Sequence, residues 1–332
     1  MKKIFFLIIL IIANLGNANA QGRADNVGTS AANFLKIDVG SRAVAMGGAY
    51  SALAQDATAL YWNPAGIANM RKSEATFSYA DWIADTKLSY AALVIPLETL
   101  GSIGFSVQSY TSGDIRETTL TKPDGTGRFF DATDLAIGVT YARAITDRFS
   151  FGGTLKIIRE DLANESATAF AFDIGSVFRT DFYGGLRIAF VMANFGSDMR
   201  LSGRDLGSNF VNENGKSVST LLETTDWELP LVFRFGIALD GYKTENSRLS
   251  LAFDVNDTRD FEPRFNAGAE YAFAEKFFLR GGYRFNYDEE TFTAGAGLNL
   301  DIPGFTNVKF NYALVDGGVF NLVHRYTVAL GF

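Results

Sequence analysis

The feature that most constrains this chain is an alternation of apolar and polar side chains with a period of two residues. In the last ten residues one face is large and apolar while the other is small or polar: His324, Tyr326, Val328, Leu330 and Phe332 alternate with Arg325, Thr327, Ala329 and Gly331. Successive side chains of a strand point to opposite faces. A last strand that closes on an aromatic residue is typical of transmembrane β-barrels. We therefore predict that Tyr326, Val328, Leu330 and Phe332 face lipid and serve recognition by the barrel-assembly machinery.

The same alternation recurs in about fourteen segments from Ala75 onward. It is clean in Phe292 to Ile302, Leu231 to Asp240, Leu249 to Asn256 and Phe277 to Asn286. A soluble β-sandwich also alternates, but two features favour a membrane barrel. The segments run to about nine to eleven residues, the length that a tilted strand needs to cross a bilayer. Their polar faces are rich in Gly, Ala, Ser and isolated charges, which suits a crowded lumen.

Connection lengths support an even number of strands. If the first strand starts in the periplasm, even-numbered connections should be short and odd-numbered ones long. The even connections are all tight: Glu98–Gly101, Thr146–Arg148, Thr180–Tyr183, Gly241–Asn246, Ala274–Lys276 and Pro303–Thr306. Two odd connections are long, Thr111–Thr133 and Gly196–Glu228. We predict an all-β fold, a 14-stranded antiparallel transmembrane β-barrel over residues 73–332.

The first twenty residues have the organisation of a secretory signal peptide. Lys2 and Lys3 precede an apolar run from Ile4 to Leu15, and Ala18-Asn19-Ala20 forms a small-x-small cleavage site. The apolar run is too short for a membrane-spanning helix. We expect residues 1–20 to be removed during export and the mature chain to begin at Gln21.

Residues 21–72 lack the alternation and are rich in Ala and Gly. Short helices are expected at Ser30–Ile37, Ser41–Leu53 and Asp56–Tyr61, with Ser41 and Asp56 as caps. A small-residue segment that precedes a barrel is best interpreted as a partly helical plug, or hatch, folded inside the lumen. The alternative, a disordered periplasmic tail, is disfavoured by its large apolar side chains.

Composition excludes several classes of function. Loss of Lys2 and Lys3 with the signal peptide would change the formal charge from −7 to −9, which argues against a nucleic-acid partner. The chain has no Cys and a single His, His324, so we predict no thiolate or multi-histidine metal site. No catalytic or cofactor motif is present. We therefore expect a protein that is not an enzyme and carries neither metal nor cofactor.

One N-terminal stretch is a recognisable motif. Gly40-Ser41-Arg42-Ala43-Val44-Ala45-Met46-Gly47-Gly48-Ala49-Tyr50 leads into Asp56-Ala57-Thr58-Ala59-Leu60-Tyr61-Trp62-Asn63-Pro64-Ala65-Gly66. It resembles the N-terminal signature of the PorV/PorQ family of outer-membrane proteins, within the wider FadL-like superfamily of fatty-acid-transporter barrels. The detailed match covers roughly residues 32–70. The resemblance implies a fourteen-stranded barrel with an N-terminal hatch in the outer membrane of a diderm bacterium.

The plug motif has a direct physical interpretation. Asn63 precedes Pro64 and cannot easily stay helical, so the chain must turn there. Gly47, Gly48 and Gly66 allow close backbone approach. Asp56 and Trp62 complete the set of plug residues that we single out.

Buried Asp56 needs a partner, and the last four strands offer a lumenal basic stripe of Arg280, Arg284, Lys309 and Arg325. We hypothesise that Asp56, together with Asp38, latches the hatch to this stripe. An equally weighted alternative is that the stripe pairs with wall carboxylates, which are Asp254, Glu270 and Asp301.

Two functions and a purely structural role, that of a closed barrel whose plug never moves, remain open. The resemblance to PorV implies a barrel that receives exported proteins in a type IX secretion pathway, with the two long outer connections as the docking surface and secreted cargo or secretion-system components as partners. Val211, Leu221, Leu222 and Trp227 would add apolar contacts, or fold over the barrel mouth. The alternative is transport of fatty acids or other hydrophobic small molecules. A pocket for such a ligand would be lined by Phe34, Leu35, Tyr50, Tyr61 and Trp62, which could equally form the packed interior of the hatch.

Overall fold

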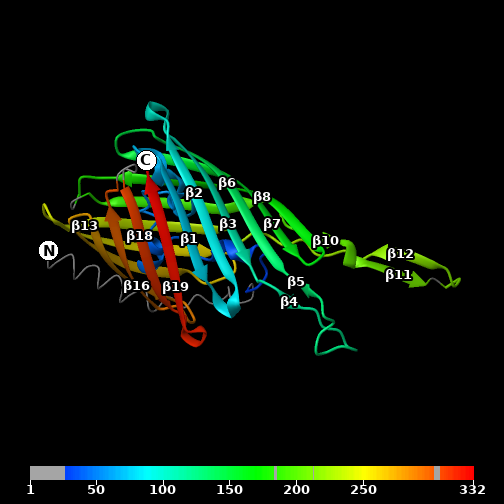
Figure 1. The fold of residues 1–332 in the computed structure, drawn as a ribbon. Coiled ribbons are helices and arrows are strands. Elements are labelled where there is room, and N and C mark those ends of the chain that lie inside the picture. Colours follow the sequence, from blue (N-terminus) through cyan, green and yellow to red (C-terminus); the bar gives the residue numbers. More distant parts are fainter. Residues whose placement is uncertain (1–26, 183–184, 212, 303–306) are drawn as a thin grey trace.

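The computed structural model describes residues 27–182, 185–211, 213–302 and 307–332. Within these residues, fourteen antiparallel wall strands form one closed sheet (Figure 1), and the two-residue β10 (Ser202–Gly203) adds to it by pairing with β8. The sheet closes where β1 (Glu74–Asp81) pairs with β19 (Leu322–Gly331), with Glu74 opposite Gly331. The predicted fold class, a plugged antiparallel transmembrane barrel, is confirmed. The predicted signal peptide lies outside the described residues.

The remaining wall strands follow chain order around the barrel. They are β2 (Lys87–Pro96), β3 (Ser102–Thr111), β6 (Ala132–Ala144), β7 (Phe149–Leu162), β8 (Glu165–Arg179), β9 (Arg187–Gly196), β13 (Val232–Lys243), β14 (Ser247–Thr258), β15 (Arg264–Phe273), β16 (Phe277–Phe285), β17 (Phe292–Leu300) and β18 (Asn307–Asp316). β6, β7 and β8 have 13, 14 and 15 residues, so they are longer than the predicted nine to eleven. These three strands lie next to the long connections, and their extra residues extend the wall there.

The wall places apolar side chains outward and polar or small ones inward, as the alternation predicts. On β19, His324 and Tyr326 are exposed, whereas Arg325 and Thr327 are buried. Large apolar side chains such as Phe105, Leu155 and Phe310 are exposed all around the wall. A continuous apolar surface of this kind is stable when it faces lipid rather than water.

Short and long connections lie at opposite ends of the barrel. We call the end that holds the last residues of β19 the turn end and the opposite end the loop end. The predicted tight connections lie at the turn end, where η5 (Glu98–Leu100) joins β2 to β3. Tyr183 and Pro303–Thr306 lie outside the described residues.

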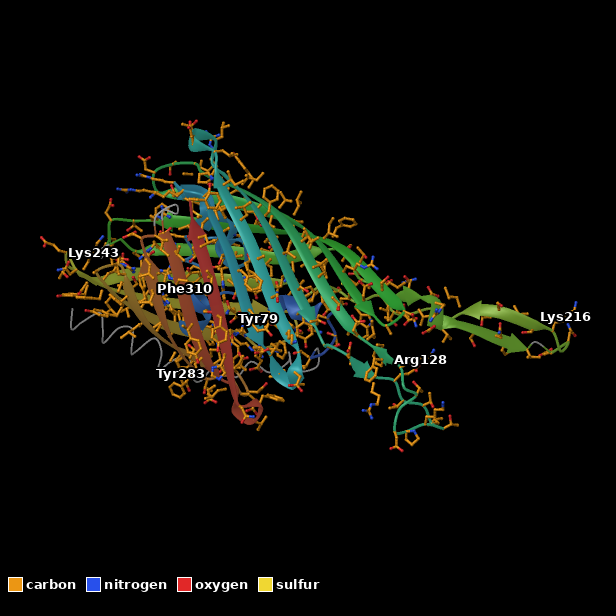
Figure 2. All side chains as sticks on the ribbon, viewed as in Figure 1. Tyr79, Arg128, Lys216, Lys243, Tyr283 and Phe310 are labelled. Carbon is orange, nitrogen blue, oxygen red and sulfur yellow. The ribbon has the colours of Figure 1, made fainter. Side chains whose placement is uncertain are left out.

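Two long connections extend the loop end. The first carries β4 (Ile115–Arg116) and β5 (Phe129–Phe130), and the second carries β10 (Ser202–Gly203), η7 (Arg204–Leu206) and a hairpin of β11 (Gly207–Val211) and β12 (Ser217–Leu221). The hairpin projects well beyond the wall (Figure 1). Lys216 near its tip and Lys243 at the turn end mark opposite extremes of the molecule in Figure 2. Short 3-10 turns, η4 (Ile83–Asp85) and η8 (Gly318–Phe320), close two other loop-end connections.

The segment before β1 forms a plug inside the barrel. It contains η2 (Asn33–Lys36), α2 (Ser41–Ala45), α3 (Ala59–Trp62) and η3 (Pro64–Asn69). The predicted helical patches are present but shorter, because Gly47 and Gly48 adopt positive φ and end the middle one. None of the helices in the described part of the chain is long and apolar enough to span a membrane.

Charge on the outward face should destabilise the barrel only where that face meets lipid. Leu155 on β7 is 73% exposed and Leu120 in the first long connection is fully exposed, so the two leucines form a matched pair. We expect Leu155→Arg to lower the free energy of unfolding in lipid vesicles by about 2–4 kcal/mol, the range for a cation in the bilayer interior. Leu120→Arg should be neutral. Equal tolerance of both changes in a denaturant titration would show that the wall faces water.

Candidate functional site

The lumen is filled by close backbone packing between the plug and the wall. A set of inward-facing wall glycines leaves room for the plug, because a Cβ on any of them would lie 2.0–2.6 Å from a plug atom. The set is Gly104, Gly152, Gly175, Gly236, Gly268 and Gly282. On Gly282 that Cβ would lie 2.1 Å from the backbone nitrogen of Gly47. The glycines that the alternation placed on the polar face therefore act as contact surface for the plug.

The motif glycines serve the same close approach from the plug side. Gly47 and Gly48 adopt φ of 68° and 81°, which disfavours any side chain. A Cβ on Gly66 would lie 2.2 Å from the carbonyl oxygen of Ala54. These placements agree with the predicted role of the three glycines in tight packing.

Trp62, Asn63 and Pro64 fix the turn between α3 and η3. The Trp62 indole is fully buried and donates from Nε1 to the carbonyl oxygen of Val39 at 2.9 Å. The Asn63 side chain accepts from the backbone of Ala65 at 3.1 Å, and it donates to the carbonyl oxygens of Ser51 and Ser176 at 3.0 and 3.1 Å. Pro64 occupies the first turn of η3, where its missing N–H is harmless. Asn63 thus joins two parts of the plug to the wall.

Polar wall side chains hold the plug backbone directly. The Asp254 carboxylate accepts from the backbone nitrogens of Tyr50 and Ser51 at 3.3 and 2.9 Å. The Thr327 hydroxyl accepts from the backbone of Ser41 at 2.8 Å. Asp254 is fully buried on β14, so this wall carboxylate binds the plug backbone.

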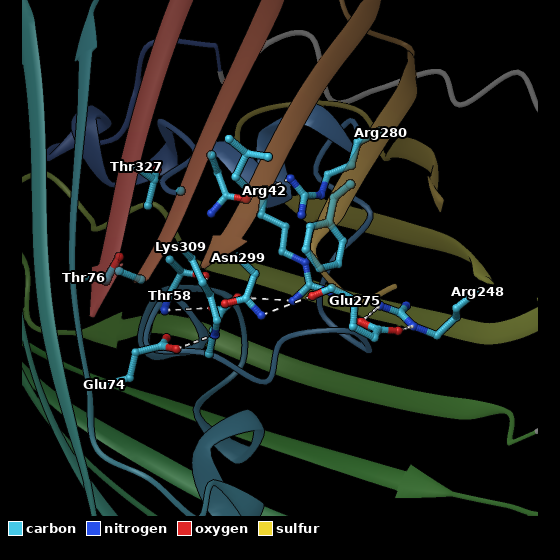
Figure 3. Close-up of a pocket in the computed structure, with 16 residues that line it drawn as sticks. Arg42, Thr58, Glu74, Thr76, Arg248, Glu275, Arg280, Asn299, Lys309 and Thr327 are labelled. Atoms are coloured by element: carbon cyan, nitrogen blue, oxygen red, sulfur yellow. Dashed lines mark hydrogen bonds and ion pairs between the residues drawn. The ribbon is translucent and has the colours of Figure 1, made fainter. Parts of the chain in front are cut away.

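A charged network ties the plug to the wall at the turn end. Figure 3 shows the neighbouring residues that line a cavity there, among them Arg42, Arg280 and the pair of Glu74 with Lys309. Arg42 on α2 makes a bidentate ion pair with Glu270 on β15, at 2.8 Å for each contact. Arg280 and Arg248 also contact this fully buried carboxylate, at 2.7 and 3.2 Å. Glu74 adds a second tie, because it accepts from the backbone of Ala57 at 2.8 Å and pairs with Lys309 at 2.6 Å.

The predicted contact of Asp56 with the basic stripe of the wall is wrong. Asp56 contacts the plug residues Arg42, Tyr50 and Thr58, and Arg42 in turn binds the wall. Burial disfavours the charge on Asp56, but the positive charges of Arg42 and Lys309 outweigh it. The pKa of Asp56 is therefore lowered, and the carboxylate is held in its charged form. Arg42 is the residue that sequence reasoning missed, although it is the sole cation in a small-residue stretch of the motif.

The predicted basic stripe is lumenal, but it divides into two pairs. Arg280 and Lys309 line a turn-end cavity of about 170 Å³, whereas Arg284 and Arg325 line a loop-end cavity. Arg284 pairs with Asp38 at 2.7 Å, and Arg325 donates to the Asp38 carbonyl oxygen.

Both sequence-based hypotheses for these cations are therefore partly right. The plug residue Asp38 binds Arg284, while the wall carboxylate Glu270 binds Arg280. Asp301 instead lies 3.7 Å from Lys276.

The predicted ligand-lining residues do not share one cavity. Tyr50 and Trp62 are fully buried, with their rings edge to face at 6.0 Å between centroids. Leu35 and Tyr61 line a space of about 30 Å³, too small for an organic ligand. Phe34 lines a larger loop-end cavity of about 630 Å³.

The described residues contain no cluster of three or more His, Cys, Asp or Glu side chains that could hold a metal ion. His324 lies on the outer face of the wall, where its Nδ1 is 2.7 Å from the Tyr312 hydroxyl. The polar chemistry of the lumen consists of ion pairs and hydrogen bonds that hold the plug in place.

Comparison with known proteins identifies a matching protein family and solved structures with a similar barrel. A family model described as "Type IX secretion system protein PorV" matches residues 19–223, more than half of the chain. No curated protein sequence matches the chain significantly. Among solved structures, the CymD monoaromatic hydrocarbon channel is similar at 12% identity and a TM-score of 0.55, over 88% of this chain and 96% of that chain.

Two toluene transporters are similar to the same degree. The Ralstonia pickettii transporter TbuX has 12% identity and a TM-score of 0.55, over 88% of this chain and 97% of its own. The P. putida transporter TodX has 11% identity and a TM-score of 0.55, over 88% and 96%. At these identities the likeness shows the shared barrel fold.

Adding one methyl group to the plug contact should loosen it. We expect Gly282→Ala to lower the free energy of unfolding by about 1–3 kcal/mol, the range for an overpacked core, and to raise ion conductance in planar bilayers. Gly281→Ala is the matched control, because a Cβ there would meet nothing closer than 4.0 Å. Identical conductance for both variants would contradict the tight plug contact.

Removal of the Arg42 ion pair should release the plug more than removal of the Asp56 charge. Arg42→Gln removes the bidentate ion pair between the plug and Glu270, while Arg280 and Arg248 still compensate this carboxylate. The cost should therefore stay below the about 3–5 kcal/mol of a buried charge left without any partner. Asp56→Asn keeps the contact between plug and wall. We expect thermal unfolding and conductance to respond strongly to Arg42→Gln and weakly to Asp56→Asn; the reverse order would restore the direct Asp56 latch.

Proposed function

Because this chain belongs to the PorV family of type IX secretion system proteins, we propose that it docks exported proteins at the cell surface. The family, the closed barrel and its similarity to outer-membrane transporters point to the outer membrane of a diderm bacterium. In this proposal the barrel is a non-enzymatic anchor, and the two long loop-end connections receive the cargo.

The observation that carries the proposal is the exposed hairpin of β11 and β12. Every described residue of its two strands is exposed, and Phe210, Val211 and Leu221 are each at least 62% exposed. Apolar side chains held this far from the wall are stabilised when a partner covers them. An isolated two-stranded hairpin is also only marginally stable in water. Both facts favour a hairpin that works as a contact arm.

Not all of the predicted apolar contacts project outward. Leu222 is 60% exposed beside the hairpin, but Trp227 pairs through its backbone with Met199 and lines the cavity of about 630 Å³. The second long connection therefore folds partly over the mouth and partly away from it. The hairpin is the part that remains available for docking.

The alternative function is transport of hydrophobic small molecules. The observation that favours it is the same loop-end cavity, which Phe34, Ile37, Tyr110 and Trp227 line together with acidic residues. The toluene transporters with the same fold support this alternative by analogy. Against it stands the plug, whose backbone contacts the wall glycines and leaves two small lumenal spaces, of about 30 Å³ near Leu35 and Tyr61 and about 170 Å³ at the turn end.

Polar substitution on the arm should block delivery of exported proteins without affecting the barrel. In cells that lack the wild-type protein, we expect the triple variant Phe210→Ser, Val218→Ser, Leu221→Ser to leave exported proteins in the periplasm and to reduce their surface level several-fold. Val319→Ser, which removes an exposed apolar side chain from a different loop-end connection, should behave as wild type. Quantitative surface proteolysis measures the outcome.

Normal surface delivery by the triple variant would contradict docking through the arm. If deletion of the whole gene spared export but abolished uptake of a labelled fatty acid, the transport alternative would replace the proposal.

A further inference from the structure

A second loop-end cavity, separate from the one below the long connections, has the composition of an anion-binding site. Its volume is about 510 Å³, within the range of small-molecule sites. Plug residues form one side of it, and the loop-end parts of five wall strands and their connections form the rest. Its cationic lining residues are Lys36, Arg234, Arg264, Arg284 and Arg325, and its aromatic ones are Trp82, Phe261, Tyr287 and Phe320.

Two of these arginines are buried without an acidic partner. Arg234 and Arg325 are 5% and 2% exposed. Among the described residues, no carboxylate oxygen lies within 4 Å of their nitrogens, whereas Lys36 pairs with Asp260 and Arg284 pairs with Asp38. A buried cation without a counter-ion is costly. Arg234 and Arg325 therefore carry positive charge into this cavity, and no carboxylate of the described residues forms an ion pair with either of them.

The cavity also contains polar atoms that lack hydrogen-bond partners. The Nε atoms of Arg284 and Arg325 and the Oγ1 atom of Thr258 are buried and unpartnered. These are three donors that an anion could accept from, and both arginine side chains are 3% exposed or less. A fourth unpartnered atom, Oδ1 of Asn256, is an acceptor for an N–H or O–H group. Buried polar atoms normally have partners, so this concentration in one cavity indicates a ligand.

Aromatic rings orient the guanidinium groups. Arg325 lies over the ring of Trp82 at 4.6 Å. Arg264 lies between two rings, 4.1 Å from the centroid of Phe261 and 4.5 Å from that of Tyr287. Stacking leaves the edges of a guanidinium, where its N–H donors are, open to a planar acceptor. The rings also provide apolar surface for the body of a ligand.

Acidic residues around the cavity offset this charge only in part. Asp38 and Glu290 act on Arg325 and Asp254 acts on Arg234 electrostatically, but none of them forms an ion pair with these two arginines. Asp288 and Glu289 are exposed on the connection between β16 and β17, where solvent screens them. Glu290 pairs with Arg284. Arg234 and Arg325 are more deeply buried than Asp288 and Glu289, so their positive charge attracts an anion that enters the cavity.

We propose that this cavity binds an organic carboxylate whose apolar or aromatic body packs against Trp82, Phe261 and Tyr287. The carboxylate accepts from Arg325, Arg264 and Arg234. The same chemistry could come from a free small acid or from an acidic side chain of a polypeptide. The site is independent of docking by the β11–β12 arm, because it lies on different connections.

Isothermal titration of the detergent-solubilised full-length protein tests the proposal. We expect benzoate to bind, and benzamide to bind at least about tenfold more weakly, because its neutral amide loses the charge-assisted hydrogen bonds. Inorganic phosphate keeps the charge but lacks an apolar body to pack against the rings, so it should also bind more weakly than benzoate. The tripeptide Gly-Glu-Gly, titrated in parallel with its neutral counterpart Gly-Gln-Gly, identifies the source of the carboxylate. The source is a free acid if benzoate binds more tightly than the glutamate peptide. It is a polypeptide if the glutamate peptide binds more tightly than benzoate.

Arg264→Gln is the diagnostic variant, since Arg264 makes ring contacts but no ion pair within 4 Å among the described residues. It should weaken benzoate binding at least about tenfold, while the barrel stays folded and loses no more thermal stability than two ring contacts account for. Arg143→Gln, at the turn end of β6, is the matched control and should bind as wild type. Absence of benzoate binding, equal binding of benzamide, or an unchanged affinity in Arg264→Gln would each overturn the proposal.

Discussion

Backbone pairing between β1 and β19 is the constraint on which the rest of the structure depends. In lipid an unpaired strand edge would leave a row of N–H and C=O groups without partners, so the sheet must close. Closure between Glu74 and Gly331 at one end and Ala80 and Arg325 at the other fixes the width of the lumen. The wall cannot collapse to fill that width, so the chain has to supply the filling from its own N-terminal segment.

The plug explains why both glycines and charged residues are frequent on the inner face of the wall. Glycines are frequent on the inner face because the plug approaches the wall with its backbone, as Gly282 does against Gly47. Charged residues are frequent there because the plug backbone and its few polar side chains need partners away from water. Arg42 and Glu270 satisfy each other across this contact. The plug is thus held by close packing and by ion pairs at once.

The sequence predicts the wall well and the plug contacts poorly, for a physical reason. Strand alternation and turn length are local properties, so the barrel and the two ends can be recognised from short windows. The pairing of Arg42 with Glu270 joins residues 228 positions apart and depends on the rotation of the plug in the barrel, which no local pattern encodes. The same holds for Asp38 and Arg284. Burial of Asp56 predicts a charged or polar partner, but the sequence does not show that this partner lies within the plug, where Arg42, Tyr50 and Thr58 contact its carboxylate.

A filled lumen also determines where recognition can take place. With the plug packed against the wall, surfaces at the loop end are separated from the turn end, and the arm and the arginine-lined cavity face the same side of the membrane. The plug is one element that contacts the wall at both ends, so it is a candidate route by which binding at the loop end would affect the turn end. Asp38 is the point at which this connection would run, because it contacts Arg284 and Arg325 of the cavity and precedes α2, whose Arg42 holds the turn-end network. If the loop end docks exported proteins as proposed, the plug keeps that surface apart from the turn end, and the short segment around Asp38 contacts both regions.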